Sequence, residues 1–395
     1  MKIELIATAT FGLEAVVRRE IEALGYKIIR TEDGRVTYMG DERAIVRSNL
    51  WLRSADRVYI RMGEFTAKTF EELFQQTKAI AWEDIIPVDG RFPVVGGSVK
   101  SVLHSVPACQ SIVNKAVASR LGDFYCLSHL PETGGEYSIR FMANKDKFLL
   151  MIDTSGEGLH KRGYRVQDVA APMKETLAAA LVQLSFYRKD RILVDTCCGS
   201  GTIPIEAAMI ARNIAPGLSR SFACEKWDMI SPDIWKEEKK AAFEAADFDT
   251  ELNITGLDID RKAMKAAKAN ADEAGLIDDI DFASMDMTNW MPGDGIPKGA
   301  SRDDHGVVIS NLPYAMRVGT TEGNKKIYQH FGKLMKECPN WSFFLITADK
   351  EIEKELEKIT GRKADRRRKL YNGTIETQFY QYHGERPKKV TDREG

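Results

Sequence analysis

The spacing of apolar residues along the chain changes near residue 160. Before that point, short apolar runs typical of β-strands alternate with segments in which apolar residues recur every three or four positions, the period of a helix with one buried face. Strands are expected at residues 2–8, 35–39, 56–63, 137–142 and 148–154, and helices at residues 13–24, 41–52, 69–79 and 111–120. This mixture predicts small α+β units.

A regular alternation of buried strands and helices begins at about residue 171. Strands are expected at residues 192–196, 254–258, 280–284, 306–310 and 341–347, and helices at residues 202–212, 261–274 and 350–359. A closing hairpin turns around Asn372 and Gly373, a residue pair that favours tight turns. The pattern predicts an α/β, Rossmann-like fold with a mostly parallel sheet and an antiparallel C-terminal hairpin.

The composition is that of a globular protein with apolar cores. The 395 residues exceed one ordinary domain, and 43% are apolar and 29% charged. No apolar run is long enough to predict a membrane span and no signal-peptide pattern is seen, so we expect a cytoplasmic protein. The six cysteines form no Cys-x-x-Cys pair, which argues against a zinc site or a disulfide framework, fits a reducing compartment, and leaves no metal site expected. A net charge of −1 means that a nucleic-acid partner would require local basic patches.

A glycine-rich turn joins the strand at 192–196 to the helix at 202–212. Gly199 and Gly201 lack side chains where backbone can approach a ligand closely, and a helix begins directly afterwards. The turn suits a nucleotide-like cofactor, although a dinucleotide site or a simple tight turn gives a similar pattern. Pro204 stands where a dinucleotide fingerprint has its third glycine, which disfavours a nicotinamide cofactor.

Acidic and amide side chains follow the successive strands of this half. Asp195, Asp258, Asp286 and Asn311 stand at or just after strand ends. Because ligands of parallel α/β sheets bind at the carboxyl ends of the strands, we expect these residues to line one crevice. Asp258 can accept both hydroxyls of a ribose; Asp260 competes for this role but also suits the N-cap of the next helix. Bracing of the turn by Asp195 and a solvated position for Asp286 are the alternatives.

Residues 311–314 carry chemistry suited to a flat base with an exocyclic amine. The lone pair of such an amine is delocalised into the ring. If the Asn311 side-chain oxygen and the Leu312 carbonyl accept its two N–H bonds, the nitrogen moves towards tetrahedral geometry and can attack a methyl group. Pro313 fixes the backbone, and Tyr314 can stack on the base, a contact worth about 1–3 kcal/mol. Positioning then dominates, and no strong general base is required.

On these residues the C-terminal half resembles class I S-adenosylmethionine-dependent methyltransferases. The whole chain resembles the bacterial THUMP-domain family of ribosomal RNA guanine-N2 methyltransferases. The resemblance rests on residues 97–113, 152–165, 171–177, 193–202, 310–314 and 368–373. It implies a ferredoxin-like subdomain at residues 1–65, a THUMP RNA-binding domain at residues 66–165 and a methyltransferase domain at residues 166–395.

The resemblance also implies the cofactor and the site residues. It assigns S-adenosylmethionine to Thr176, Asp195, Cys197, Gly199, Gly201, Thr202, Asp258, Asp286 and Asn311. It places Asp195 near the methionine ammonium and Asp286 near the adenine amine. Cys197 and Cys198 lie in the cofactor turn, so we interpret them as small turn residues and not as nucleophiles.

An RNA partner, most simply ribosomal RNA, is implied by the THUMP resemblance. The candidate phosphate contacts are Lys100, His104, Lys115, Lys161, Arg162, Arg165, Arg366, Arg367 and Arg368. Residues 215–251, with Trp227 and Trp235 beside a charged helix-like run, are interpreted as an insertion. We expect its aromatic residues to form a small core of their own, with contact to RNA as the alternative.

Three alternatives stay open at this point. The sequence Asn-Leu-Pro-Tyr also occurs in ribosomal RNA adenine-N6 dimethylases, so residues 311–314 do not distinguish guanine N2 from adenine N6. The N-terminal half favours guanine. A non-catalytic RNA-binding assembly factor and a NAD-dependent oxidoreductase are the other two. The complete set of strand-end residues disfavours the first, and Pro204 disfavours the second.

Overall fold

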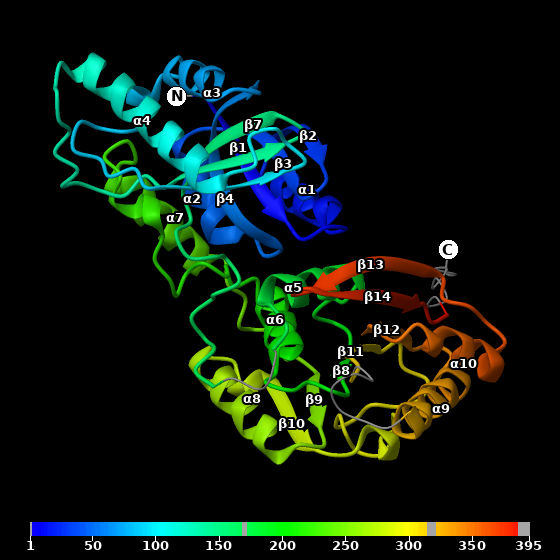
Figure 1. Ribbon diagram of the computed structural model, residues 1–395. Coiled ribbons are helices and arrows are strands. Elements are labelled where there is room, and N and C mark those ends of the chain that lie inside the picture. The colour runs from blue at the N-terminus through cyan, green and yellow to red at the C-terminus, as the bar shows by residue number, and fades with distance from the viewer. Residues whose placement is uncertain (1, 168–171, 314–320, 386–395) are drawn as a thin grey trace, which may run out of the picture. The chain divides into compact units, whose positions relative to one another are not determined.

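The computed structural model describes residues 2–167, 172–313 and 321–385 (Figure 1). The chain divides into two compact units. The first draws its described residues from Met1–Ala9, Val17–Leu159 and Arg220–Ala241, and the second from Thr10–Val16, His160–Ser219 and Ala242–Gly395. In the described part of the chain, none of the helices combines the length and apolar character needed to cross a membrane.

The first unit is an α+β structure built on one seven-stranded sheet with the strand order β2-β3-β1-β4-β7-β6-β5. Its strands are β1 (Ile3–Ala9), β2 (Lys27–Glu32), β3 (Arg35–Gly40), β4 (Ala55–Thr66), β5 (Val94–Val99), β6 (Ile139–Asn144) and β7 (Lys147–Asp153). Its helical segments are α1 (Glu14–Ala23), α2 (Glu42–Trp51), α3 (Phe70–Lys78), η1 (Trp82–Asp84) and α4 (Val106–Tyr125).

The long strand β4 makes this sheet continuous. Its first half pairs with β1, from Ala55 to Ile60, and its second half pairs with β7, from Tyr59 to Thr66. All pairs of the sheet are antiparallel except β5 with β6. The expected ferredoxin-like and THUMP regions therefore share one sheet, and the expected boundary after residue 65 falls at the end of β4.

The insertion contributes to the core of the first unit, which corrects the expectation of a separate small core. Phe222, Cys224, Trp227, Ile230 and Trp235 are buried in the same cluster as the first unit's sheet residues. The Trp227 ring stacks on Tyr137 with 4.6 Å between ring centroids, and its indole N–H donates to the Glu136 carbonyl at 2.9 Å. These buried aromatics are not available to RNA.

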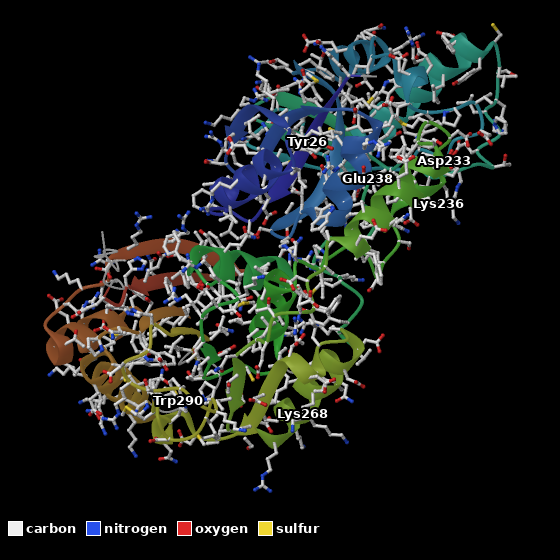
Figure 2. All side chains as sticks on the ribbon, turned by 180° about the vertical axis from the view of Figure 1, so that it is seen from behind. Tyr26, Asp233, Lys236, Glu238, Lys268 and Trp290 are labelled. Atoms are coloured by element: carbon white, nitrogen blue, oxygen red, sulfur yellow. The ribbon has the colours of Figure 1, made fainter. Side chains whose placement is uncertain are left out.

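Helix α7 (Pro232–Glu244) carries charge on its other side. Figure 2 shows Asp233, Lys236 and Glu238 projecting from this helix. Glu238 accepts a hydrogen bond from Arg43 at 2.7 Å and forms an ion pair with Arg47 at 3.2 Å. The insertion therefore joins the first unit through both apolar packing and ion pairs.

The second unit is an α/β structure on a seven-stranded sheet with the order β10-β9-β8-β11-β12-β14-β13 (Figure 1). Its strands are β8 (Leu193–Asp195), β9 (Ile254–Asp258), β10 (Ile280–Ser284), β11 (Val307–Asn311), β12 (Ser342–Thr347), β13 (Arg366–Asn372) and β14 (Ile375–Tyr382). Its helices are α5 (Glu175–Leu184), α6 (Thr202–Ala211), α8 (Arg261–Glu273), α9 (Thr321–Glu337) and α10 (Glu351–Thr360). Its short 3₁₀ turns are η3 (Ile277–Asp279) and η4 (Met287–Asn289), whereas η2 (Ala223–Lys226) lies in the inserted segment of the first unit.

Alternation along the strands places apolar residues on both faces of this sheet. Val307 and Ile309 of β11 belong to the cluster that contains apolar residues of α5 and α6, whereas Val308 belongs to the cluster with residues of α9 and α10. A strand that is buried on both faces has a nearly continuous run of apolar residues in its sequence, and helices cover both faces of such a sheet. Strands β8 to β12 pair in parallel, and β14 joins antiparallel. The Rossmann-like fold with an antiparallel C-terminal hairpin is confirmed.

Candidate functional site

The strand order of the second unit has its switch point between β8 and β11. Strand β8 pairs with β9 on one side and with β11 on the other, so the connections that leave it run in opposite directions. Ligands of open α/β sheets bind outside the carboxyl ends of strands at such a point. Asp195, Asp258 and Asn311 end β8, β9 and β11, so the sheet brings them to this edge.

The glycine-rich turn after β8 is held by backbone geometry that glycine favours. Gly199 has φ +54° and Gly201 has φ +82°, both in the left-handed region. A Cβ on Gly201 would lie 3.1 Å from Cβ of Ala267 on α8. The Cys198 amide donates to the Leu257 carbonyl at 2.9 Å, which ties the turn to β9. Because these glycines have no side chains, backbone atoms of the turn line the space in front of the first residues of α6.

Asp195 is a buried carboxyl group without a cationic partner among the described residues. Its Oδ1 accepts the Cys197 amide at 3.1 Å. Burial raises its pKa to about 8, and the nearby charge of Asp258 acts in the same direction. A buried carboxylate that lacks a cation is suited to an ammonium group, because the ligand would supply the missing charge. These features fit the methionine end of S-adenosylmethionine.

The sequence left open whether Asp258 or Asp260 contacts the ribose, because Asp260 also suits the N-cap of the next helix. Asp258 Oδ2 accepts the Gly199 amide at 2.9 Å, and its Oδ1 accepts the Asp260 amide at 2.9 Å. Asp260 is exposed and caps α8 by accepting the Lys262 amide at 2.8 Å. Asp258 is therefore the carboxylate beside the glycine turn, and Asp260 is a helix cap.

The other expected cofactor residues are also buried or half-buried near these strand ends. Asp286 accepts the Thr288 amide and hydroxyl at 2.9 and 2.8 Å, so it braces η4. Thr202 begins α6, and Thr176 is buried in the first turn of α5. Burial raises the pKa of both turn thiols, Cys197 and Cys198. Protonated thiols are poor nucleophiles, which agrees with their interpretation as turn residues.

Residues 311–313 extend from the end of β11. Asn311 is half-buried there, and the Leu312 amide donates to the Ile346 carbonyl of β12 at 3.0 Å. Pro313 follows, half-buried. Tyr314, the expected stacking residue, lies outside the described residues.

Ser310 is a site residue that sequence reasoning missed. Its hydroxyl accepts the Thr196 amide at 3.0 Å and lies 2.9 Å from the Thr196 hydroxyl. A hydrogen bond between Ser310 and Asp195 opposes the upward shift of the Asp195 pKa. A serine one residue before Asn311 gave no signal, because serine is common at strand ends of every kind.

Arg165 takes a role different from the expected RNA contact. Its guanidinium donates to Glu175 Oε1 at 2.8 Å, to Ser200 Oγ at 3.1 Å and to Thr202 Oγ1 at 3.1 Å. Asn270 Nδ2 also donates to the Ser200 carbonyl at 3.1 Å. The side chains of Arg165 and Asn270 both form hydrogen bonds with Ser200 in the glycine-rich turn. Arg165 is therefore a positioning residue for this turn, and Asn270 is a second one that the sequence did not single out.

Arg162 is also not placed to contact RNA, which corrects the expectation. Its side chain is 2% exposed and donates to Glu206 Oε1 of α6 at 3.3 Å. Tyr164 donates to the same carboxylate at 3.1 Å. A charged side chain is tolerated in such a site only with its partner, so this ion pair is part of the second unit's core.

The other expected RNA contacts lie on the surface of each unit. In the first unit, Lys100 follows β5, His104 precedes α4, and Lys115 lies on α4; all three are exposed. In the second unit, Lys161 and Arg366 are exposed. Arg367 pairs with Glu353 at 2.6 Å, and Arg368 donates to the Gly12 carbonyl at 2.7 Å, so both have internal partners. Among the described residues, no cluster of His, Cys, Asp or Glu could hold a metal ion.

Family models match three consecutive parts of the chain. The RlmL ferredoxin-like domain matches residues 4–59, the THUMP domain residues 67–153, and the RMKL-like methyltransferase domain residues 162–381. The last match covers more than half of the chain and includes every strand of the second unit's sheet.

Two relatives align with nearly the whole chain. One is named putative RNA methyltransferase YpsC, from Bacillus subtilis (strain 168), and is 45% identical over 383 residues, covering 96% of both chains. The other is named ribosomal RNA large subunit methyltransferase K/L, from Cellvibrio japonicus (strain Ueda107). It is 29% identical over 96% of this chain, and the match spans 51% of the relative. The chain therefore spans about half the length of that second relative.

Solved structures with the same architecture include SMU.472, a putative methyltransferase complexed with SAH. It superposes with a TM-score of 0.90 and 41% identity over 98% of this chain and 99% of that one. A predicted N6-adenine-specific DNA methylase from Listeria monocytogenes gives a TM-score of 0.88 and 45% identity over 98% and 97%. The chain belongs to the RMKL-like methyltransferase family, in which S-adenosylmethionine is the methyl donor.

Proposed function

We propose that this chain transfers a methyl group from S-adenosylmethionine to the exocyclic N2 amine of a guanine in RNA, with 23S ribosomal RNA as the most suitable substrate. The observation that carries the proposal is the position of Asn311 and Leu312. They leave β11 at the same sheet edge at which Asp195 and the glycine turn end β8. RNA is supported by the THUMP match and by the names of the two relatives.

The cofactor residues of the proposal are those at the switch point. Asp195 would hold the methionine ammonium, Asp258 the ribose hydroxyls, and Gly199 and Gly201 the close backbone approach. Asp286 is proposed for the adenine amine, with Cys197, Thr202 and Thr176 completing the walls. Bound S-adenosylmethionine supplies a methyl group on a sulfonium, an electrophile with a good leaving group.

The protein's own contribution is to orient the attacking amine. Asn311 Oδ1 and the Leu312 carbonyl oxygen would accept one N–H bond each, which draws the nitrogen towards tetrahedral geometry, localises its lone pair and directs that lone pair at the methyl group. The C–N bond forms as the S–C bond breaks, and one amine proton then leaves to solvent. Pro313 fixes the direction of the Leu312 carbonyl, and Tyr314 is proposed to stack on the base.

RNA capture is proposed for the exposed basic residues of each unit. Lys100 follows β5, His104 precedes α4 and Lys115 lies in the middle of α4, all within the part of the first unit matched by the THUMP model. Lys161 and Arg366 are the candidates in the second unit. We propose domains at residues 1–65, 66–165 and 166–395, with residues 220–241 assigned to the first unit in space.

Adenine N6 is the alternative target, because its amine would present the same two N–H bonds to Asn311 and Leu312. The name of one similar structure, a predicted N6-adenine-specific DNA methylase, points the same way. The THUMP match favours an RNA substrate over DNA in either case.

The test of this function is methyl incorporation into RNA. The purified chain is incubated with labelled S-adenosylmethionine and with ribosomal RNA or ribosomal assembly intermediates from cells that lack the protein, and the Asn311→Ala variant is the control. We expect label in the RNA with the unchanged protein and none with the variant. Tight cofactor binding without incorporation into any of these substrates would instead support a non-catalytic assembly factor.

A further inference from the structure

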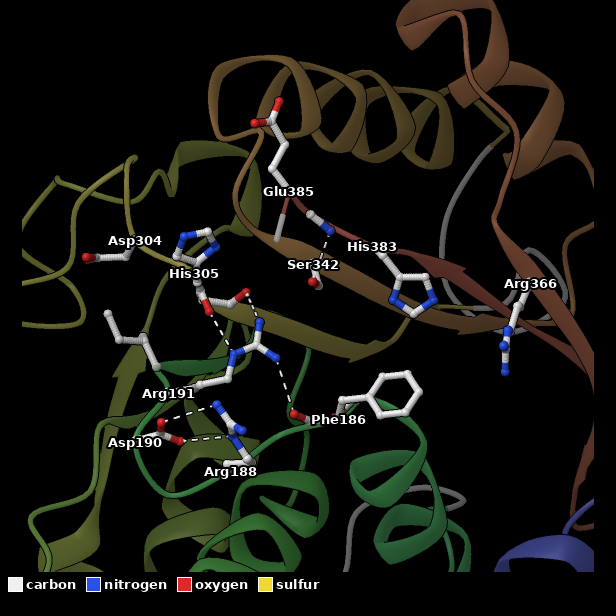
Figure 3. Close-up of a pocket in the computed structure, with 14 residues that line it drawn as sticks. Phe186, Arg188, Asp190, Arg191, Asp304, His305, Ser342, Arg366, His383 and Glu385 are labelled. Atoms are coloured by element: carbon white, nitrogen blue, oxygen red, sulfur yellow. Dashed lines mark hydrogen bonds and ion pairs between the residues drawn. The ribbon is translucent and has the colours of Figure 1, made fainter. Parts of the chain in front are cut away.

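A second pocket lies in the methyltransferase unit at the edge of the sheet opposite the cofactor residues (Figure 3). Its volume is about 800 Å³, within the range of small-molecule sites. Gly306 and Ser342, at the amino ends of β11 and β12, line it, together with His383 after β14. Asn311 is at the other end of β11. The five residues of that strand span roughly 17 Å at about 3.3 Å per residue.

Arg191 lines this pocket, and its guanidinium donates to backbone carbonyls. Its guanidinium donates to three backbone carbonyls: those of His305 at 2.8 Å, Phe186 at 3.2 Å and Gly306 at 3.2 Å. Among the described residues, no carboxylate forms an ion pair with it, because Asp190 pairs with Arg188 at 3.3 Å. Burial lowers the pKa of Arg191. A half-buried guanidinium that donates only to neutral acceptors can still bind an anion nearby.

The charge at the His383 side of the pocket is positive. Burial lowers the pKa of the His383 imidazole. One acid, Asp365, raises this pKa, and three arginines lower it: Arg191, Arg362 and Arg366. Asp365 already pairs with Arg362 at 2.8 Å. Arg366 is exposed, and no hydrogen bond or ion pair to its side chain is found within the described ranges. Figure 3 shows the carboxyl groups of Asp304 and Glu385 directed away from this side.

Phe186 supplies an aromatic wall in an unusual backbone conformation. It follows the C-cap of α5 with φ +58°, a position that usually favours glycine, yet its ring is 54% exposed. The ring centroid lies 5.8 Å from that of His383 at an interplanar angle of 49°. A strained, exposed aromatic residue gains little from packing, so an outlier of this kind points to use of the ring by a ligand.

We propose that this pocket binds a nucleotide, with the base against Phe186 and His383 and a phosphate at Arg191 and Arg366. Aromatic rings bind bases of any sequence by stacking, and arginines without carboxylate partners bind phosphate. The nucleotide is either free or part of an RNA strand, since both present the same chemistry. The inference concerns a site other than the methyl-transfer site and does not depend on which base is methylated.

The test measures binding to the full chain with S-adenosylhomocysteine present, so that no methyl transfer is required. The probes are GMP, a ten-nucleotide single-stranded RNA and inorganic phosphate. The variants are Phe186→Gly, which removes the ring and suits the left-handed backbone, and Arg366→Gln, which removes one exposed charge. Phe248→Ala and Lys363→Gln are the matched controls, because Phe248 is an exposed aromatic and Lys363 an exposed cation of the same unit that do not line the pocket.

We expect Phe186→Gly to melt at or above the temperature of the unchanged protein and to weaken nucleotide binding about tenfold. Arg366→Gln is expected to lower the slope of log affinity against log salt for the RNA by about 0.7, the value for one phosphate contact on a single strand. If GMP binds and its affinity falls in the Phe186→Gly and Arg366→Gln variants, the ligand is a free nucleotide. If only the RNA binds and its affinity falls in these two variants, the ligand is an RNA strand.

The proposal is overturned if the two pocket variants bind both nucleotide probes as the controls do. It is also overturned if inorganic phosphate binds in an Arg366-dependent way while Phe186→Gly changes nothing, because the pocket would then be a simple anion site. The Asn311→Ala variant should keep the nucleotide binding. A failure of the proposed methyl transfer is therefore distinguishable from a failure of this inference.

Discussion

The side-chain hydroxyls of Thr196 and Ser310 lie 2.9 Å apart, where β8 and β11 reach the carboxyl edge of the sheet. The Ser310 hydroxyl also accepts the Thr196 amide at 3.0 Å. This contact fastens the residue after Asp195 to the residue before Asn311, although more than a hundred residues separate them in sequence. The proposed cofactor carboxylate and the proposed amine-binding residue are therefore held on one rigid support.

The raised pKa of Asp195 predicts that this residue destabilises the protein when no ligand is bound. The carboxyl has a pKa of about 3.9 in an unfolded chain and about 8 in the folded state. The folded state therefore keeps a proton that the unfolded chain releases, and stability is lost as the pH rises from about 4 to about 8. We expect Asp195→Asn to raise the melting temperature at pH 8, by about 2–4 °C per kcal/mol regained, and to do so much less at pH 5.

The same variant should lose affinity for S-adenosylmethionine, since a neutral amide does not balance the ammonium. Thermal unfolding at the two pH values and calorimetric titration of the cofactor check both effects. A melting temperature that falls equally at pH 5 and pH 8 would contradict the role given to burial of this carboxyl.

Asp258 and Asp260 form a matched pair of tests two residues apart. Asp258→Ala should weaken cofactor binding by about 1.5–3 kcal/mol, the range for a hydrogen bond to a charged group. Asp260→Ala should leave that affinity unchanged and cost about 1 kcal/mol of stability, because it removes the cap of α8. Cofactor titration and thermal unfolding of both variants separate the roles, and equal cofactor affinities would remove Asp258 from the ribose site.

Arg165→Lys tests whether this side chain holds the glycine turn. Lysine keeps the charge but loses the fork that reaches Glu175, Ser200 and Thr202 together. Two hydrogen bonds of about 0.5–1.5 kcal/mol each correspond to roughly a tenfold loss of S-adenosylmethionine affinity. RNA affinity, measured separately by filter binding, should not change. A loss of RNA affinity with normal cofactor binding would restore the phosphate contact that the sequence suggested.

Asn311→Ala should abolish methyl transfer while leaving cofactor affinity nearly unchanged. The variant removes the acceptor proposed for one N–H of the target amine and leaves Asp195, Asp258 and the glycine turn intact. Single-turnover methylation and cofactor titration on the same preparation provide the comparison. An active variant would eliminate the proposed amine-orienting mechanism.

The inserted segment offers a test of the first unit's core. Trp227→Ala removes a fully buried ring stacked on Tyr137 and should cost about 3–5 kcal/mol of stability. Phe243, on α7 of the same insertion, is 72% exposed, so Phe243→Ala should change stability by less than about 0.5 kcal/mol. Denaturant unfolding followed by circular dichroism measures both. Similar, small effects would indicate that the insertion does not belong to that core.

The strands of the methyltransferase unit could be predicted from sequence because their patterns are strong, whereas helices α5 and α9 were not among the expected elements. Strands β9 and β10 begin and end at the expected residues, since each is a short run between a turn and a helix with clear periodicity. Strand β2 of the first unit was not expected from the sequence, and neither was strand β5. Strand β5 contains Gly96 and Gly97 and lies at the edge of its sheet, so its residues alternate weakly and carry little strand propensity.

Long-range placement could not be predicted from local pattern. Nothing in the composition of Arg220–Ala241 indicates that its tryptophans pack against residues near Tyr137, because that packing depends on the return of the chain to a distant sheet. Arg162 and Arg165 lie in a charged, glycine-rich segment that is typical of an exposed linker. Their burial depends on Glu206 and Glu175, acids supplied by two later helices.

The identity of the methylated nucleoside tests the central claim most directly. Ribosomal RNA from cells that lack the protein is methylated in vitro with labelled S-adenosylmethionine, digested to nucleosides and analysed by mass spectrometry. We predict that the label is found in N2-methylguanosine and that the Asn311→Ala protein gives none. Label in N6-methyladenosine would contradict the assignment to guanine N2, although it would leave the cofactor site and the role of Asn311 in place.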